Sequence, residues 1–450
     1  MARTMEEWQA CSAARLPEAW RFSREQQRQR ERAYDAARDE VEREAKRARR
    51  GAVRGSVGGW RSGFQRGAGG GERQGKLKKD PAETRGEIQK RITAAFARFA
   101  ATALDLPDEA ITLLTEDFLP VGTGLARWAR QFDPGLSMAE IIQAARNAWT
   151  ACGLQPLLGQ PMRLTPSILG YSLLYPYSDN FLDGETSDAA KLRFSERFRE
   201  RLRGDTVAAR DDREAPVWAL VDLVEQEYPR ARFPQVYDSL LAIHRAQEWS
   251  LRQVRGSTDC PLEDLLRVSC AKGGTSVLAD ACLAQPWLTE AENRFAFAWG
   301  VLLQLGDDLQ DVREDSERRS MTLFSRAAAR GERLDGLVIQ LLTFAERVGA
   351  MMEALPQSTP TLNGLLRMSW RSLILMAVAE AHEHCSAEFL RAAEEQSPFR
   401  FGFLRERREK LAGRRGLYAT LFELFLTTED RAGVGLPVAD AALAVQADVA

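Results

Sequence analysis

The chain has 450 residues, of which 44% are hydrophobic and 28% are charged, so it can bury a sizeable core and could form two or three domains. Its net charge of −2 argues against a role in which the whole chain binds nucleic acid. The six cysteines lack the spacing of a metal site, and no secretory leader is visible at the N-terminus. The longest apolar stretches, near residues 295–305 and 373–379, are too short to span a bilayer. We therefore expect a cytoplasmic protein without a transmembrane segment.

Residues 1–85 differ in composition from the rest of the chain. Residues 1–50 interleave acidic and basic residues with few aliphatic ones, and residues 51–79 contain ten glycines and seven basic residues against one acid, Glu72. Such a segment cannot bury enough apolar surface to fold alone. We expect a charged helical arm and an Arg/Gly-rich linker that are disordered and dispensable for activity. The alternative is a segment that binds RNA or an anionic surface, with nucleic acid not expected on the main domain.

From about residue 86 onward, apolar residues recur at intervals of three and four, which is the period of an amphipathic helix. Pro and Gly separate these segments, and no strand-like alternation is long enough to indicate a sheet. The pattern predicts an all-α fold. We expect one large helical bundle over residues 86–430, behind the mobile N-terminal arm and followed by a flexible tail at 431–450.

Two acidic stripes interrupt this apolar helical sequence. Asp179 and Asp183 are four residues apart, and so are Asp307, Asp311 and Asp315. Residues four apart lie on one face of a helix, where like charges oppose helix formation by roughly 0.2–0.5 kcal/mol per pair. The alternative, without a functional role, is a solvated helix face that makes salt bridges, but the neighbouring residues here are apolar. Carboxylates without His or Cys partners suit a hard cation, and Mg²⁺ is the first candidate.

Aromatic residues precede each stripe on the same helical face. Trp299 lies two turns before Asp307, and Tyr175 lies one turn before Asp179. This arrangement predicts a deep apolar cavity with a charged rim, although such aromatic residues are more often simply core. Pro176 lacks an N–H group and should distort its helix just before the carboxylates.

The second stripe belongs to a longer pattern, Gln-Leu-Gly-Asp-Asp-Leu-Gln-Asp-Val-Arg-Glu-Asp over residues 304–315. This pattern resembles the second aspartate motif of the class I isoprenoid synthase superfamily, and Asp179-Asn-Phe-Leu-Asp183 resembles the first motif. The resemblance implies an all-helical bundle of the terpene synthase type, in which the two motifs face each other across a cavity. It also implies a magnesium cluster, held by the aspartates of both stripes, that binds and ionises a prenyl diphosphate.

The resemblance and the chemistry of phosphate binding together suggest further site residues. Basic side chains would add hydrogen bonds to phosphate oxygens, and we expect Lys272, Arg318 and Arg319 to do so, with Tyr175 and Trp299 lining the cavity. Lys272 stands in Ala-Lys-Gly-Gly-Thr, which resembles the Lys-Thr-Gly region of prenyl synthases, where glycines let backbone N–H groups approach a phosphate. The alternative for Lys272 is a surface lysine at a helix break. No residue is assigned a catalytic role beyond binding.

Two departures from the family pattern reduce the set of functions that we expect. Asn180 replaces the paired aspartate of chain-elongating enzymes, and Ser269-Cys-Ala-Lys-Gly replaces the aromatic signature of squalene and phytoene synthases. The nearest resemblance is to the atypical bacterial class I terpene synthases of the large-terpene-synthase type. We expect a Mg²⁺-dependent terpene synthase that acts on one prenyl diphosphate. The alternatives are a prenyltransferase that joins two prenyl diphosphates, like squalene and phytoene synthases, and a non-catalytic helical interaction protein. The sequence leaves open the substrate length and the oligomeric state, including a homo-oligomer.

Overall fold

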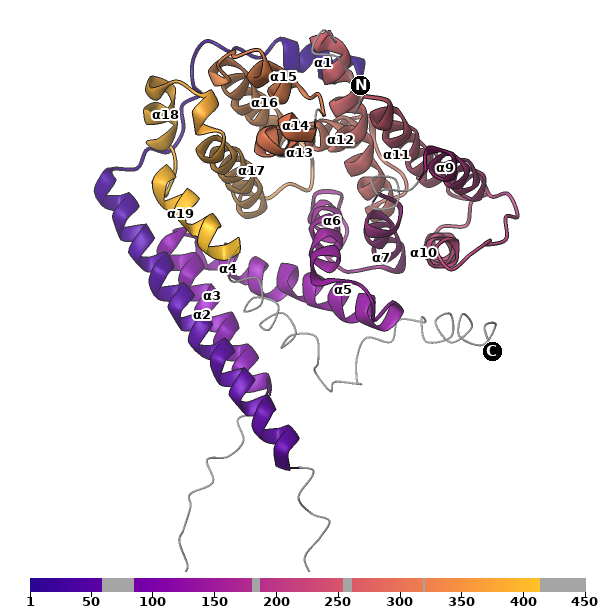
Figure 1. Ribbon diagram of the computed structural model, residues 1–450, viewed down its shortest axis with the longest axis horizontal. Helices are drawn as coiled ribbons and strands as arrows, with labels where there is room; N and C mark the ends of the chain where they lie inside the picture. The colour runs from indigo at the N-terminus through magenta and orange to yellow at the C-terminus, as the bar shows by residue number, and fades with distance from the viewer. Residues whose placement is uncertain (59–84, 180–186, 254–260, 319, 413–450) are drawn as a thin grey trace, which may run out of the picture.

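The computed structural model describes residues 1–58, 85–179, 187–253, 261–318 and 320–412 of the chain. All regular structure within these ranges is helical, which confirms the predicted all-α fold (Figure 1). The N-terminal half contains α1 (Ala2–Gln9), α2 (Arg24–Gly58), α3 (Arg85–Ala103), α4 (Asp108–Thr112), α5 (Leu119–Phe132), α6 (Met138–Leu157), α7 (Pro166–Leu174), α9 (Asp188–Arg203) and α10 (Glu214–Glu227). The C-terminal half contains α11 (Pro234–Gln253), α12 (Leu262–Ala284), α13 (Glu290–Gln310), α14 (Val312–Arg318), α15 (Leu323–Ala329), α16 (Asp335–Glu353), α17 (Pro360–Glu380), α18 (Ala387–Glu394) and α19 (Phe401–Ala412).

Local sequence fixes where the helices of the site begin. At the start of α13, the hydroxyl of Thr289 accepts a hydrogen bond from the N–H of Glu292 at 3.3 Å. The carboxylate of Glu292 accepts one from the N–H of Thr289 at 2.7 Å. This capping box satisfies two N–H groups that the first turn leaves without helical partners. Ser137 and Glu140 form the same arrangement at the start of α6.

Helix α12 stands between two apolar cores and contributes to both. One core joins it to α1, α13, α15, α16 and α17, and contains Phe295, Phe324 and Phe344 with none of their surface exposed. The other joins it to α5, α6, α7, α9, α10 and α11. Because α12 is packed on both sides, it is buried along most of its length and fixes the position of α13 relative to α6.

The N-terminal arm is not mobile over the part that the structure describes. Trp8 of α1 is 3% exposed and packs edge-on against Phe344, with ring centres 5.7 Å apart. Further along, α2 and α3 form a long pair that extends away from the body of the molecule (Figure 1). The carboxylate of Glu31 on α2 binds Arg400, whose Nε lies 2.9 Å from Oε1.

The prediction of a disordered arm over residues 1–85 is therefore wrong for α1 and the first half of α2. Charged residues that suggested a solvated helix form ion pairs with the C-terminal helices, as Asp35 does with Arg407 at 2.7 Å. The Arg/Gly-rich segment 59–84 and the tail at 431–450 lie outside the described residues. Within the described part of the chain, no helix is both long enough and apolar enough to cross a membrane.

Candidate functional site

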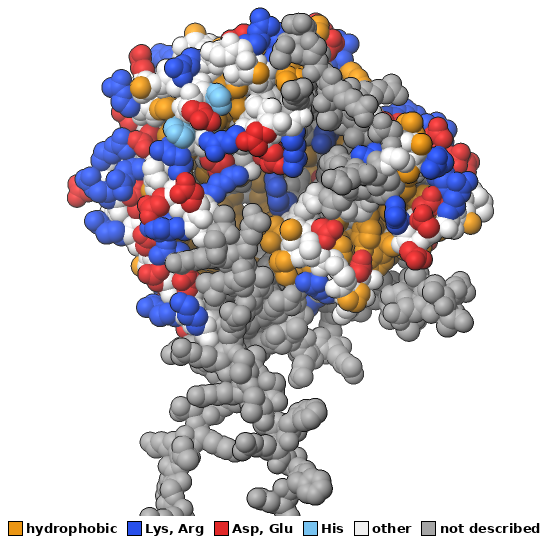
Figure 2. Space-filling model, viewed as in Figure 1, with side chains coloured by type: hydrophobic (Ala, Val, Ile, Leu, Met, Phe, Trp, Pro, Cys, Tyr) orange, Lys and Arg blue, Asp and Glu red, His pale blue; other side chains and the backbone are white. Residues whose placement is uncertain are grey.

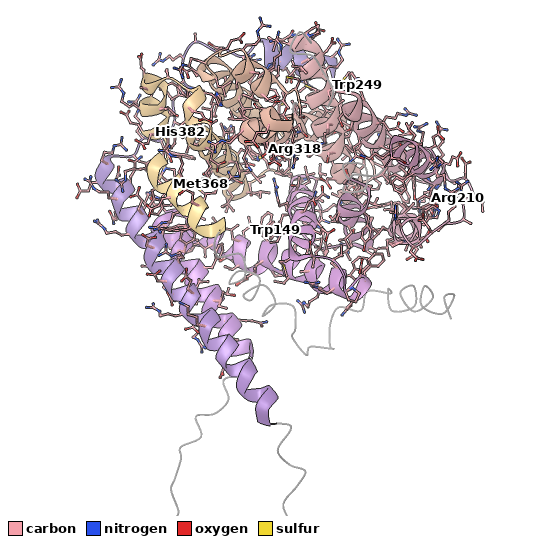
Figure 3. The ribbon with its side chains drawn as sticks, in the orientation of Figure 1. Trp149, Arg210, Trp249, Arg318, Met368 and His382 are labelled. Atoms are coloured by element: carbon pink, nitrogen blue, oxygen red, sulfur yellow. The ribbon has the colours of Figure 1, made fainter. Side chains whose placement is uncertain are left out.

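A cavity of about 1840 Å³ lies between helices from both halves of the chain. Residues of α2, α3, α4, α6, α12, α13, α17 and α19 line it, and most of these are apolar or aromatic. In Figure 3, Trp149 lies on α6 and Met368 on α17, two residues that line this space. A pocket for one drug-sized ligand measures roughly 300–1,000 Å³, so this cavity is large.

The second acidic stripe lies at one end of this cavity. Asp307 and Gln310 of α13 line the cavity, and Asp311 stands between α13 and α14. Helical hydrogen bonds continue across that boundary, because the N–H of Asp311 bonds to the carbonyl of Asp307 at 2.9 Å, and Asp315 to Asp311 at 2.8 Å. The spacing of four is therefore preserved, and Asp307 and Asp311 line the cavity, with Asp315 one turn beyond.

Asp308 points away from this stripe and into the protein. Its side chain is 6% exposed and accepts hydrogen bonds from Ser269 Oγ at 2.6 Å and from Gln304 Nε2 at 2.8 Å. Ser269 belongs to α12, so this carboxyl group ties α13 to α12. Asp308 thus holds the acidic segment in place from behind.

The carboxyl groups of the acidic segment all have raised pKa values. Partial enclosure by the protein, followed by repulsion from Asp308 and Asp311, raises the pKa of Asp315 to about 7. Burial raises the pKa of Asp308 to about 6 against its two hydrogen bonds. Enclosure also raises the pKa values of Asp307 and Asp311, with repulsion adding to the effect at Asp311. Each of these groups would be charged more easily if a cation lay beside it.

Three basic side chains surround the acidic segment. Arg146 of α6 donates to Asp307 from 3.4 Å, with both side chains about half exposed or more. Lys272 of α12 lines the cavity and lowers the pKa values of Asp307 and Asp315 by its charge. Arg408 of α19 lines the cavity, pairs with Glu380 and lowers the pKa of Asp311. Figure 2 shows basic and acidic side chains close together near the middle of one face.

The glycines beside Lys272 do not form a phosphate loop. Gly273 and Gly274 lie in the middle of α12, where backbone N–H groups take part in the helix. A Cβ atom on Gly273 would lie 2.3 Å from the carbonyl oxygen of Gly300, and one on Gly274 would lie 2.4 Å from the ring of Phe297. The expectation that these N–H groups approach a phosphate is wrong, as is the alternative of a helix break, because both glycines allow close contact between α12 and α13.

The structure describes only the first of the two arginines that follow the stripe. Arg318 is 72% exposed, pairs with Glu314 at 2.6 Å, and is absent from the residues that line the cavity. It lies on α14 in Figure 3. The structure therefore does not bring Arg318 into the predicted phosphate site, while Arg319 lies outside the described residues.

Of the first acidic motif, residues 179–183, the structure describes only the backbone of Asp179. Helix α7 ends at Leu174 and passes into one wider π-helical turn, Tyr175–Asp179. This change coincides with Pro176, as the missing N–H group predicts, and such turns are frequent at functional sites. The side chains of Tyr175 and Asp179 and the whole of Asp183 lie outside what the structure describes, so their places in the site stay predictions.

Trp299 lines the cavity. It is 3% exposed and lies between Phe295 and Trp370, with ring centres 5.5 and 5.6 Å away. Its Nε1 atom makes no hydrogen bond within the described part of the chain. Trp299 therefore belongs both to the wall of the cavity and to the apolar core behind it.

Sequence reasoning missed several polar residues of the cavity. Arg146 and Asn147 are adjacent on α6, and each reaches a different carboxyl group, Asp307 and Asp280 respectively. Arg408 comes from α19, near the end of the described chain. The available signal was charged or amide residues within an alanine-rich helix, as in Ala-Ala-Arg-Asn-Ala over residues 144–148. That signal shows no partner, because the partners are more than 100 residues away.

The donor set suits a hard cation in its chemistry. Asp307, Asp311 and Asp315 offer carboxylate oxygens at one end of the cavity, with pKa values raised by enclosure and, at Asp311 and Asp315, by mutual repulsion. Among the described residues, no three His, Cys, Asp or Glu side chains already converge on one metal-sized point. The stripe would therefore supply one side of a metal site, with further ligands from another element or from the substrate.

Comparisons with known proteins add no relative. Neither a family model, nor a curated protein, nor a solved structure matches the chain.

Proposed function

We propose that the protein is a Mg²⁺-dependent terpene synthase, which ionises a prenyl diphosphate and releases inorganic diphosphate. One observation carries this proposal. A row of carboxylates with elevated pKa values, flanked by basic side chains, lies at one end of a large and mainly apolar cavity. Such a cavity suits an amphipathic substrate with an anionic head and a hydrocarbon tail. The resemblance of residues 304–315 to the second aspartate motif of class I isoprenoid synthases supports the same reading.

The basic residues would hold the diphosphate group. Arg146 can turn its planar guanidinium from Asp307 to two phosphate oxygens, and Lys272 supplies a point charge from the neighbouring helix. Asp307 and Asp311 would hold Mg²⁺ against the same oxygens, with Asp315 following one turn later. The bound Mg²⁺ would neutralise the diphosphate and make it a better leaving group.

The rest of the cavity would accommodate the prenyl chain. Trp149, Trp299 and Trp370 line it, and the faces of indole rings attract a positive charge by roughly 0.5–2 kcal/mol each. Apolar walls also keep water from the reacting carbons. These rings would therefore offer aromatic surface to a carbocation that formed in the cavity.

The volume of the cavity favours a second candidate. At about 1840 Å³, the space exceeds what one small ligand needs and could hold two prenyl chains. A prenyltransferase that joins two prenyl diphosphates, as squalene and phytoene synthases do, would use such a volume.

Stoichiometry separates the two candidates. Full-length protein is incubated with Mg²⁺ and prenyl diphosphates of increasing chain length, while diphosphate release and hydrocarbon products are measured. A terpene synthase releases one diphosphate per product and keeps the carbon number of the substrate. A coupling enzyme releases two and doubles the carbon number. Absence of diphosphate release with every substrate would refute both.

A variant links this activity to the acidic stripe. Asp311→Asn removes one charge from the row, and we expect diphosphate release to fall roughly a hundredfold or more because metal binding supplies several kcal/mol. Asp212→Asn makes the same chemical change at an exposed loop position and should have wild-type activity. If Asp311→Asn retains wild-type activity, the stripe does not hold the metal.

A further inference from the structure

A second carboxyl group borders the cavity and has no part in the acidic stripe. Asp280 lies on α12, eight residues after Lys272, which is about 12 Å along the helix axis. It lines the cavity, yet only 1% of its surface is exposed. Sequence patterns did not single it out, because one aspartate in an Ala/Leu-rich helix has no spacing partner.

An amide and a hydroxyl from two other helices surround this carboxyl group. Asn147 of α6 donates through Nδ2 to Asp280 Oδ1 at 3.0 Å and to Ser172 Oγ of α7 at 3.2 Å. Both Asp280 and Ser172 are almost fully buried. The carboxyl group is thereby oriented at a point where α6, α7 and α12 meet.

The second oxygen of Asp280 has no partner. Oδ2 is buried and makes no hydrogen bond within the described part of the chain. No salt bridge to a basic side chain is formed by Asp280 in the described ranges. Burial raises the pKa of the Cys152 thiol, and the charge of Asp280 raises it further. Burial raises the pKa of Asp280 well above its usual range, against the one hydrogen bond from Asn147. Burial therefore favours the neutral, protonated form of this carboxyl group.

An acid of this kind is costly if its only role is structural. An unsatisfied polar atom in an apolar interior costs roughly 1–3 kcal/mol, and leucine or asparagine would avoid a buried ionisable group. Perturbed acids in cavities are typical of proton-transfer sites. Asp280 borders the cavity two turns of α12 beyond Lys272, away from the acidic stripe, so a hydrocarbon chain in the cavity is the group to which it could transfer a proton.

We propose that Asp280 is the proton-transfer residue of the cavity, giving a proton to a carbon–carbon double bond of a neutral polyene intermediate and recovering one when the product forms. The inference rests on the proposed terpene synthase function and assigns a residue to a step beyond diphosphate release. In the first step, the Oδ2–H bond breaks and the π electrons of the double bond form a C–H bond, leaving a carbocation and the Asp280 carboxylate. After rearrangement, a C–H bond beside the cation breaks, its electrons form a new double bond, and the proton returns to Asp280.

These two steps balance by themselves. The neutral polyene arises earlier, when the first carbocation loses a C–H proton to the released diphosphate and the C–H electrons form a double bond. No oxidant, reductant or external acid is consumed, and Asp280 ends in its starting form. The carboxylate that exists between the steps lies beside the cation, which stabilises the charged pair by attraction in a medium of low dielectric constant.

Deuterium labelling tests the proposal with the wild-type protein alone. The carboxyl proton of Asp280 exchanges with solvent between turnovers, so a reaction run in D₂O with Mg²⁺ and a prenyl diphosphate should place one carbon-bound deuterium in the product. Mass spectrometry of the hydrocarbon measures it. If diphosphate is released but the product contains no deuterium, the inference is wrong while the proposed function stands. If no diphosphate is released, the proposed function fails and the inference fails with it.

The variant Asp280→Asn tests whether the incorporated proton comes from this residue. Asparagine has the same size and can accept the hydrogen bond from Asn147, but it cannot donate a proton as an acid. We expect that, per diphosphate released, this variant gives a product without deuterium and a shift toward products that need no reprotonation. Retained deuterium in this variant would overturn the proposal.

Two further variants control for damage to the fold. Asp264→Asn makes the same change on the same helix at an exposed position, and its product should keep the deuterium. Asp280→Glu restores an acid, and deuterium should reappear in its product even if the product ratio changes. If Asp280→Asn loses deuterium and Asp280→Glu, once shown to be folded by circular dichroism, also lacks it, the carboxyl group is not the proton donor.

Discussion

Gly273 of α12 and Gly300 of α13 lie backbone against backbone. A Cβ atom on Gly300 would stand 2.0 Å from the carbonyl oxygen of Gly273, far inside any real contact. The absence of side chains lets the two helices approach closely, and this approach sets Lys272 of one helix beside the acidic end of the other. Access of a basic residue to the candidate metal site thus depends on two glycines that carry no chemistry themselves.

Gly300→Ala should lower stability strongly. The new methyl group meets backbone rather than the end of a flexible side chain, so α12 and α13 must separate, and overpacking of this kind costs roughly 1–3 kcal/mol or more. Thermal unfolding measures the loss. Gly306→Ala lies on the same helix with nothing within 4 Å of the added Cβ, and it should be neutral or stabilising by up to about 1 kcal/mol. Equal melting temperatures for the two variants would contradict this view of the crossing.

The stability of the metal-free protein should depend on pH through Asp308. Its pKa is raised from 3.8 to about 6, so the fold favours the neutral form, and stability is lost as pH rises from about 4 to 6. A pKa unit corresponds to about 1.4 kcal/mol, which sets the loss at up to roughly 3 kcal/mol. Asp308→Asn should therefore gain stability relative to wild type between pH 4 and pH 7.

Chemical denaturation at pH 4, 5, 6 and 7 measures this gain. Asp212→Asn, the same chemical change at an exposed loop position, is the control. A difference between Asp308→Asn and wild type that is the same at pH 4 and pH 7 would show that Asp308 ionises normally in the folded protein.

Trp299 should influence both stability and the product. Trp299→Ala removes a ring that lines the cavity and stacks on Phe295, so we expect a loss of roughly 3–5 kcal/mol together with a changed product mixture or accepted chain length. Phe295→Ala is the matched control, since Phe295 is fully buried one turn earlier on α13 and does not line the cavity. It should lose similar stability with unchanged product ratios. Identical product profiles for both variants would remove Trp299 from the cavity wall that shapes the substrate.

The N-terminal helix should be required for a stable fold. Trp8→Ala opens a hole in the larger core beside Phe344 and should cost roughly 3–5 kcal/mol. Deletion of residues 1–23 removes the same contacts and the bond from Gln340 Nε2 to the carbonyl of Trp8 at 2.9 Å. Trp287→Ala, at a tryptophan that is 57% exposed, should cost much less. If the truncated protein has the same melting temperature as wild type, the arm is dispensable, as the sequence predicts.

Sequence reasoning was least successful where charged residues form tertiary contacts. Residues 1–50 suggested a solvated arm because their charges have no visible partners in the sequence. Glu31 and Asp35 pair with Arg400 and Arg407, more than 350 residues later. The buried Gln27, which donates to the carbonyls of Glu394 and Ser397, was hidden for the same reason. Charge alone does not reveal whether a helix is solvated or paired.

By itself, the sequence determined the all-α class, the acidic stripe at Asp307, Asp311 and Asp315, and the aromatic lining at Trp299. Each of these depends on the 3.6-residue period of a helix, which is local and can be read within about ten residues. Tertiary structure alone decided that Arg146 faces Asp307, that Arg318 does not reach the cavity, and that Asp280 borders it. These relationships depend on which helices cross and how closely. The crossing is set by packing between residues far apart in the chain, such as Gly273 and Gly300, and no local pattern encodes it.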